Sequence, residues 1–194
     1  MKIKRYGVRT QMAVLLLLSS FVSGCVGVVA VGAAGSMVVY DRRSFSMIEQ
    51  DARIFYVINR ALSNDRRFRY SHIRVTSFNH VVLLSGQATS EDFKAEAAKV
   101  AQSTPNVRRV YNELVIGEPS SIADRSRDAF ITSKVRTQLL TQKGLESGSI
   151  HIVTENSTVF LMGIATHEQA DLAVNAARQV SGVNKVVKIF QYIV

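Results

Sequence analysis

Few residues of the chain could carry out chemistry, and they are scattered. The sequence contains a single cysteine, Cys25, and four histidines, His72, His80, His151 and His167. The histidines lack metal-ligand spacing in either half of the chain, so we expect surface polar residues rather than metal ligands. A nucleophilic enzyme would need a nucleophile with an adjacent base, and no such pair is evident. We therefore predict no catalytic residues, no metal site and no enzymatic activity.

Cys25 stands at the end of an export signal. Basic residues precede an apolar stretch at residues 12–22 that has the length of a secretory signal; they are Lys2, Lys4, Arg5 and Arg9. The segment ends in Val22-Ser23-Gly24-Cys25, which resembles the lipobox of bacterial lipoproteins, where small residues fit the signal peptidase and the thiol accepts diacylglycerol. The resemblance implies that Cys25 becomes the first mature residue and carries diacylglycerol and an N-acyl chain, with no other cofactor.

A membrane-spanning anchor is the alternative interpretation, because residues 12–39 are apolar over most of their length. Four glycines between residues 24 and 35 lower the hydrophobicity and helix propensity of that segment, and the cysteine stands where a lipobox requires it. We therefore favour the lipoprotein. Val26 lacks the acidic side chain associated with inner-membrane retention, which implies by resemblance an outer-membrane location on the periplasmic face. Three acyl chains would make the anchor effectively permanent.

Composition indicates a folded chain and argues against nucleic-acid binding. Hydrophobic residues make up 47% of the sequence and charged residues 20%, enough apolar surface to fill a core. The net charge of +9 includes four basic residues before Cys25, which leaves 20 basic against 15 acidic residues, or +5. This modest excess differs from the dense basic stripe of nucleic-acid-binding proteins. We expect an anionic phospholipid membrane as the partner instead.

An internal repeat sets the domain organisation. A shift of 77 residues aligns nearly forty positions of the chain with one another. One matched set combines an aspartate with aliphatic residues: Asp51, Ile54, Ile58 and Leu62 align with Asp128, Ile131, Val135 and Leu139. Another has the pattern of a strand that ends in glycine: Val82, Leu84 and Gly86 align with Val159, Leu161 and Gly163. The chain therefore contains two copies of one module.

Each copy is predicted to form helix, strand, strand, helix and strand. An apolar residue at every fourth position predicts the first helix, and alternating residues around a central turn predict the two strands that follow. Thr89 and Thr166 are expected to cap the second, alanine-rich helix. Gly86 and Gly163 are expected where the backbone needs a close approach or a positive φ.

Asp51 and Asp128 are the acidic residues that recur in the first helix of each copy. We expect them near the start of that helix, where a carboxylate complements the helix dipole, rather than in acid catalysis.

The shared pattern resembles the BON domain, a module of exported bacterial proteins associated with phospholipid binding. The resemblance rests on Asp-x-x-Ile, Ile-x-Val and Val-x-Leu-x-Gly, and on the final Val-x-x-Val strand. Its most specific stretches are residues 128–141, 154–156, 159–163 and 180–183. It implies an α+β fold with two tandem BON domains, each a three-stranded mixed sheet packed on two helices. In the first copy Thr104-Pro105-Asn106-Val107 replaces a glycine-containing turn, so the second copy is the better candidate for ligand binding.

We divide the chain at the segment Gly117-Glu118-Pro119-Ser120-Ser121, which has the composition of a linker. The expected parts are a signal peptide at 1–24, a lipidated tether at 25–45, a first BON domain at 46–116, a linker at 117–126 and a second BON domain at 127–194.

The first helices of the two copies differ outside their core positions. Phe130 is expected on an outward face beside Arg127 and Lys134, and its counterpart in the first copy is Arg53, so the fold does not require an aromatic residue there. We predict that Phe130 inserts at a phospholipid interface while Arg127, Lys134 and Arg136 hold anionic headgroups. The alternative is that Phe130 packs between the two domains.

Two functions fit these observations. Resemblance to lipoproteins with two BON domains implies phospholipid binding that supports outer-membrane integrity, at division sites or near envelope assembly machinery. The alternative is a non-enzymatic scaffold that binds another envelope protein through an exposed strand edge. Lipid binding should weaken with ionic strength, whereas a protein contact should persist in detergent without anionic lipid.

Overall fold

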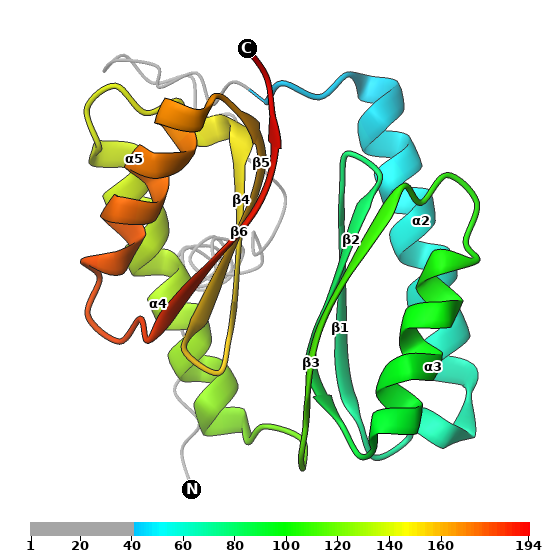
Figure 1. Ribbon diagram of the computed structural model, residues 1–194. Coiled ribbons are helices and arrows are strands. Elements are labelled where there is room, and N and C mark those ends of the chain that lie inside the picture. The colour runs from blue at the N-terminus through cyan, green and yellow to red at the C-terminus, as the bar shows by residue number, and fades with distance from the viewer. Residues whose placement is uncertain (1–40) are drawn as a thin grey trace, which may run out of the picture. The chain divides into compact units, whose positions relative to one another are not determined.

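The computed structural model describes residues 41–194, so the predicted signal peptide, Cys25 and most of the predicted tether lie outside the described residues. The first module contains α2 (Phe45–Asn64), η1 (Arg66–Phe68), β1 (His72–Phe78), β2 (Val81–Ala88), α3 (Glu91–Gln102) and β3 (Arg109–Ile116) (Figure 1). The second contains α4 (Ile122–Thr141), η2 (Ser147–Ser149), β4 (Ile150–Glu155), β5 (Thr158–Ala165), α5 (His167–Arg178) and β6 (Lys185–Tyr192). Because α4 begins at Ile122, residues 122–126 of the expected linker are helical. None of the described helices is long and apolar enough to cross a bilayer.

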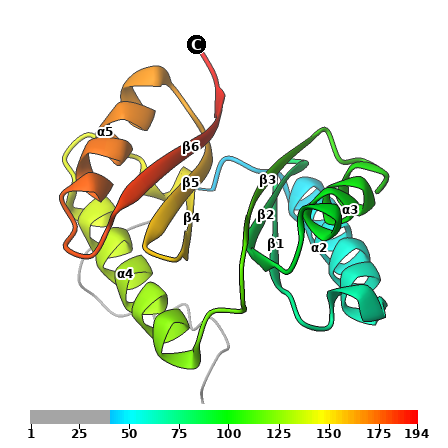
Figure 2. The ribbon, with the colours of Figure 1, turned by 60° about the horizontal axis from the view of Figure 1, so that its bottom comes forward.

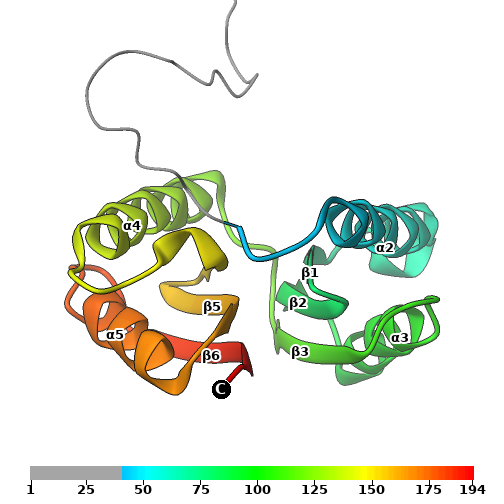
Figure 3. The same cartoon turned by 90° about the horizontal axis from the view of Figure 1, so that it is seen from above.

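The two modules have the same topology, as the repeat predicts. In each sheet the first two strands are antiparallel and the third is parallel to the second, in the orders β1-β2-β3 and β4-β5-β6. The two long helices of each module cover one face of its own sheet (Figures 2 and 3). The α+β fold, with a three-stranded mixed sheet packed on two helices in each module, is confirmed.

Each long helix begins at a hydroxyl side chain. Ser44, Ser90, Ser121 and Thr166 each accept a hydrogen bond from the backbone N–H three residues further on. These bonds satisfy N–H groups that have no partner within the helix. The prediction for Thr166 is confirmed. The prediction for Thr89 is wrong by one residue, because α3 begins at Glu91 and Ser90 is its cap.

Asp128 holds the hairpin turn of the second module. It is buried in the second turn of α4, and its carboxylate accepts hydrogen bonds from the backbone N–H groups of Asn156 at 2.7 Å and Ser157 at 2.9 Å. Both turn residues have positive φ, 48° and 58°, as expected for the two-residue turn that joins twisted strands. The expected role in the helix dipole is wrong, because the carboxylate lies beyond the first turn and points at the hairpin.

Asp51 does the same in the first module, with additional partners. Its carboxylate accepts hydrogen bonds from the backbone N–H groups of Asn79 at 2.7 Å and His80 at 2.9 Å, and from the Ser77 hydroxyl at 3.1 Å. Arg43 forms an ion pair with it at 3.0 Å. The repeated aspartate therefore fastens the first helix of each module to the hairpin turn.

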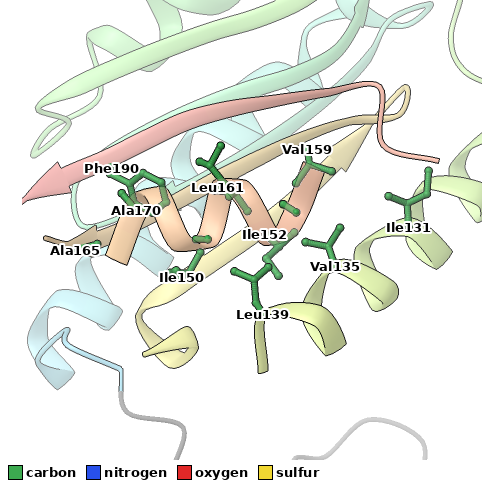
Figure 4. Packing of buried hydrophobic residues seen from close by; sticks show 13 residues of the cluster. Ile131, Val135, Leu139, Ile150, Ile152, Val159, Leu161, Ala165, Ala170 and Phe190 are labelled. Atoms are coloured by element: carbon green, nitrogen blue, oxygen red, sulfur yellow. The ribbon is translucent and has the colours of Figure 1, made fainter. Parts of the chain in front are cut away.

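Each module has its own hydrophobic core between helices and sheet. In the second module the core includes Ile131, Val135 and Leu139 of α4, which face β4 and β5 (Figure 4). Gly163 lies where a Cβ would come within 2.6 Å of the Ser149 carbonyl oxygen. Gly86 has a φ of +112°, and a Cβ there would lie 2.0 Å from the His72 carbonyl oxygen. The predicted close approach is confirmed at both glycines.

A third cluster consists of residues on the sheet faces that the helices leave uncovered. It contains Phe78, Val81, Leu83, Val153, Phe160, Met162 and Ile189, drawn from both sheets. This packing explains why every residue of β2 is buried, since its two faces are covered by different layers. Polar side chains continue the contact: Asn79 and Gln191 exchange hydrogen bonds, and the Gln87 amide donates to Glu155 at 3.1 Å. All three clusters lie within residues 41–194, so that fragment contains the buried contacts of both modules.

Candidate functional site

The helix α4 has a buried face and an outward flank. Asp128, Ile131, Val135 and Leu139 form the buried face and are each at most 5% exposed. Phe130 is 64% exposed, although α4 packs on a sheet. The outward flank around Phe130 is the candidate functional site.

Lys134 is held beside Phe130. Its ammonium lies 5.1 Å from the centre of the Phe130 ring, within the range of a cation–π interaction, and also donates to the backbone carbonyl of Ser181. Gly182 allows the loop after α5 to come this close, because a Cβ there would lie 3.2 Å from Ile131. The aromatic ring and the base thus form one fixed pair on the surface.

Arg127 lies on the same flank one turn before Phe130. Its side chain is 65% exposed and forms an ion pair with Asp124 at 3.0 Å. The Ser121 hydroxyl, together with Arg127, holds the pKa of Asp124 below its usual value, so this carboxylate is charged at neutral pH. Arg127 is therefore partly neutralised, and Lys134 is the stronger anion-binding group of the two.

Arg136 does not join this group. Six residues after Phe130, it lies about 120° around the helix axis, on the opposite flank of α4. There it lines a small pocket of about 190 Å³ with Leu139, Leu140 and Ile150. The structure thus brings together three of the four predicted site residues, Arg127, Phe130 and Lys134.

Phe130 does not pack between the modules. The cluster that joins the two sheets contains no residue of α4 among the described residues. The alternative explanation for this aromatic residue is therefore wrong.

The four histidines lie apart from one another and have separate surroundings. Burial lowers the pKa of His72 and of His151, and nearby arginines lower that of His151 further. His80 contacts side chains of α2 and of the segment before β3, and His167 stacks on Tyr192 with ring centres 3.9 Å apart. His167 is exposed as expected, His151 is partly exposed with its ring beside that of Phe78, and His72 and His80 are half-buried. Residues 41–194 contain no group of three or more His, Cys, Asp or Glu side chains that could hold a metal ion.

Sequence reasoning missed the role of the first described residues. Arg43 lies between Asp41 and Asp51, and its guanidinium carbon is 4.1 Å from the centre of the Phe78 ring. Arg42 forms an ion pair with Glu146 of the second module. The run of charged residues at 41–43 indicates ion pairs, but their spacing does not predict which residues they contact. This segment attaches the end of the predicted tether to both modules.

These observations define a duplicated α+β module with an exposed aromatic and basic flank on one of its helices. The BON domain model matches residues 50–118 and 127–193, which together cover most of the chain. The chain therefore belongs to the BON domain family.

Two similar proteins indicate where in the cell a chain of this family acts. The chain is 31% identical over 185 residues to the outer membrane lipoprotein DolP of Haemophilus influenzae, an alignment that covers 94% of this chain and 96% of the relative. It is 35% identical over 133 residues to a 21 kDa hemolysin of Actinobacillus pleuropneumoniae, with 68% and 69% of the two chains covered. These relatives are not known as enzymes, and the absence of catalysis in this chain stays a prediction. The protein is a lipid-anchored outer-membrane protein of the DolP type.

A solved structure of CdsD, a structural protein of the type III secretion system of Chlamydia trachomatis, is more distant. It shares 12% identity with a TM-score of 0.30, over 73% of this chain and 92% of that one. A likeness of this size supports no inference about function.

Proposed function

We propose that the protein binds anionic phospholipid through the outward flank of α4 and thereby supports the integrity of the outer membrane. The observation that carries the proposal is the pair formed by an exposed Phe130 and Lys134, with 5.1 Å between ring centre and ammonium. An aromatic ring and a base side by side suit the boundary between headgroups and acyl chains.

The first module provides an internal comparison. At the position of Phe130 it has Arg53, which forms an ion pair with Glu49 at 3.2 Å. Both helices nevertheless pack on their sheets in the same way, so stability does not require Phe130. An exposed phenyl ring that the fold does not need favours a role in binding.

Weak binding is sufficient for a tethered protein. Each base near an anionic surface contributes roughly 1 kcal/mol, which alone gives a salt-sensitive contact. Acylation at Cys25, which stays a prediction, would hold the modules near the bilayer and raise the effective concentration of headgroups.

Vesicle binding by residues 41–194 tests the proposal. With vesicles of phosphatidylethanolamine and phosphatidylglycerol, Phe130→Glu should weaken binding by roughly 2–3 kcal/mol, or about 30- to 160-fold, since it removes the inserted ring and adds a repelled charge. Phe45→Glu is the matched control, because Phe45 is 93% exposed at the first position of α2. If both variants bind equally well and melt at the same temperature, α4 is not the lipid-binding element.

A scaffold function is the second candidate, and the strand edges favour it. Within residues 41–194, β3 pairs only with β2 and β6 only with β5, so each has one free edge. An envelope assembly or division protein could add a strand there. Co-purification from detergent that persists at high salt and withstands Phe130→Glu would support this function instead.

A further inference from the structure

The end of α2 and the loop that follows it carry a second basic and aromatic surface, at the end of the first module where α2 leads into β1 (Figure 1). We define the η1 patch as two sets of exposed residues, Tyr56 and Arg60 on α2, and Arg66, Arg69 and Tyr70 in the segment that follows it. All five side chains are exposed, with Tyr56 at 58% and Tyr70 at 65%. It lies in the first module and is separate from the α4 flank.

The arginines of this surface are paired with tyrosines rather than with acids. The Arg60 guanidinium donates to the Tyr56 hydroxyl at 3.0 Å, and Arg69 donates to the Tyr70 hydroxyl and lies 4.8 Å from its ring centre. Within residues 41–194, the side chain of Arg66 makes no hydrogen bond or ion pair. These three guanidinium groups retain donors for an external anion.

Arg67 has a different role and marks the limit of the η1 patch. It forms ion pairs with Asp65 at 2.6 Å and with Glu96 of α3 at 3.4 Å. These contacts fasten η1 to α3, so Arg67 belongs to the structure of the module. The remaining bases cannot be explained in this way.

The fold does not require this surface. In the second module the positions of Arg69 and Tyr70 are held by Glu146 and Ser147, and the segment between the first helix and the first strand takes a different course, with its 3-10 turn at Ser147–Ser149. Only Phe68, which is buried, has an apolar counterpart, Leu145. Arg66 has a basic counterpart, Lys143, but the second copy has no counterpart of the two arginine–tyrosine pairs, which points to a function of the first module.

We infer that the η1 patch is a second contact with an anionic phospholipid surface. Guanidinium groups bind phosphate oxygens through two parallel hydrogen bonds, and tyrosine rings suit the headgroup region because one end is apolar and the other polar. A membrane is favoured over an acidic protein because the protein is lipid-anchored, so a bilayer is always within reach. Different residues carry this contact and the proposed α4 site, so each can fail without the other.

The sharpest test uses the absence of tryptophan from the chain. Tyr70→Trp in residues 41–194 places a single reporter in the η1 patch. On addition of vesicles of phosphatidylethanolamine and phosphatidylglycerol, its emission should shift to shorter wavelength, and vesicles of phosphatidylcholine alone should leave it unchanged. Unchanged emission with both vesicle types overturns the inference.

A charge-matched pair of variants gives the second measurement. Arg66→Gln with Arg69→Gln should weaken binding to the same anionic vesicles about 25-fold at low salt, taking about fivefold for each base. Arg53→Gln with Lys99→Gln removes the same charge from exposed residues of the same module outside the η1 patch and should have little effect. Equal binding by the two pairs overturns the inference, even if the patch binds an acidic protein. If Arg66→Gln with Arg69→Gln weakens vesicle binding as expected but Phe130→Glu has no effect, the proposed α4 site is refuted and the η1 patch is not.

Discussion

Replacing Asp128 by alanine should free the hairpin turn of the second module from α4 and lower the stability of the protein. The carboxylate is 5% exposed and accepts two backbone hydrogen bonds, at 2.7 and 2.9 Å, from the turn between β4 and β5. Alanine cannot accept either bond, and it leaves two N–H groups aimed at an empty space. The perturbation removes no apolar contact of the core, so the hydrogen bonds decide its size.

The cost follows from the number and kind of bonds. A hydrogen bond to a charged acceptor contributes about 1.5–3 kcal/mol, so two of them give about 3–6 kcal/mol. Water can reach the freed groups in part, because Asn156 is exposed and Ser157 half-buried. We therefore expect the lower end, about 3 kcal/mol. Asp128→Asn keeps one acceptor oxygen and should cost roughly half as much.

Urea unfolding of residues 41–194, followed by circular dichroism, measures the effect. Asp124→Ala is the matched control, since it removes an exposed carboxylate from the first turn of the same helix and should move the midpoint less than Asp128→Ala does. If Asp128→Ala shifts the midpoint no more than Asp124→Ala does, the carboxylate does not hold the hairpin.

Three further predictions concern pH, backbone packing and anchoring. Burial lowers the pKa of His72, so below the usual value of about 6.5 the unfolded chain binds a proton at this residue that the folded chain does not bind. The stability of the folded protein should therefore fall from pH 6.5 to 5, and it should fall less steeply in His72→Gln. Thermal melts at both pH values measure the difference. Gly163→Ala should cost about 1–3 kcal/mol in urea unfolding because its Cβ meets a backbone oxygen, whereas Gly117→Ala, with nothing within 4 Å, should change stability by less than about 1 kcal/mol. Cys25→Ser should abolish labelling by radioactive palmitate and release the protein from the membrane fraction, and a labelled variant would refute acylation at this residue.

The fold could be predicted because the hydrophobic spacing, the turn residues and the glycine positions occur in both copies of the repeat. The spacing of Ile131, Val135 and Leu139 matched that of the first copy, so both helices and their buried faces followed from one pattern. The turn and glycine positions were matched in the same register. Local periodicity and turn chemistry were sufficient for the modules themselves.

Contacts between distant segments could not be predicted in the same way. Asp51 and Asp128 were recognised as repeated, but their partners lie almost thirty residues further along the chain, and no local rule connects an acid in a helix with a distant turn. The run Val81 to Leu84 is typical of a strand buried on both faces, yet it does not say what covers the second face. Arg136 was grouped with Phe130 by closeness in sequence, although the helical rotation of 100° per residue separates them.

The two copies can serve as controls for one another because one polypeptide carries both and the same folding constraints act on each. Positions where the copies agree, such as Asp51 with Asp128, are those that the fold requires, and the structure shows what they hold. Where they disagree, as at Phe130 and Arg53, folding tolerates either residue. An exposed aromatic side chain at such a position adds little stability and exposes apolar surface. Phe130 is distinguished from the other exposed apolar residues by Lys134, which lies against its ring, and this difference between the copies is the best guide to function.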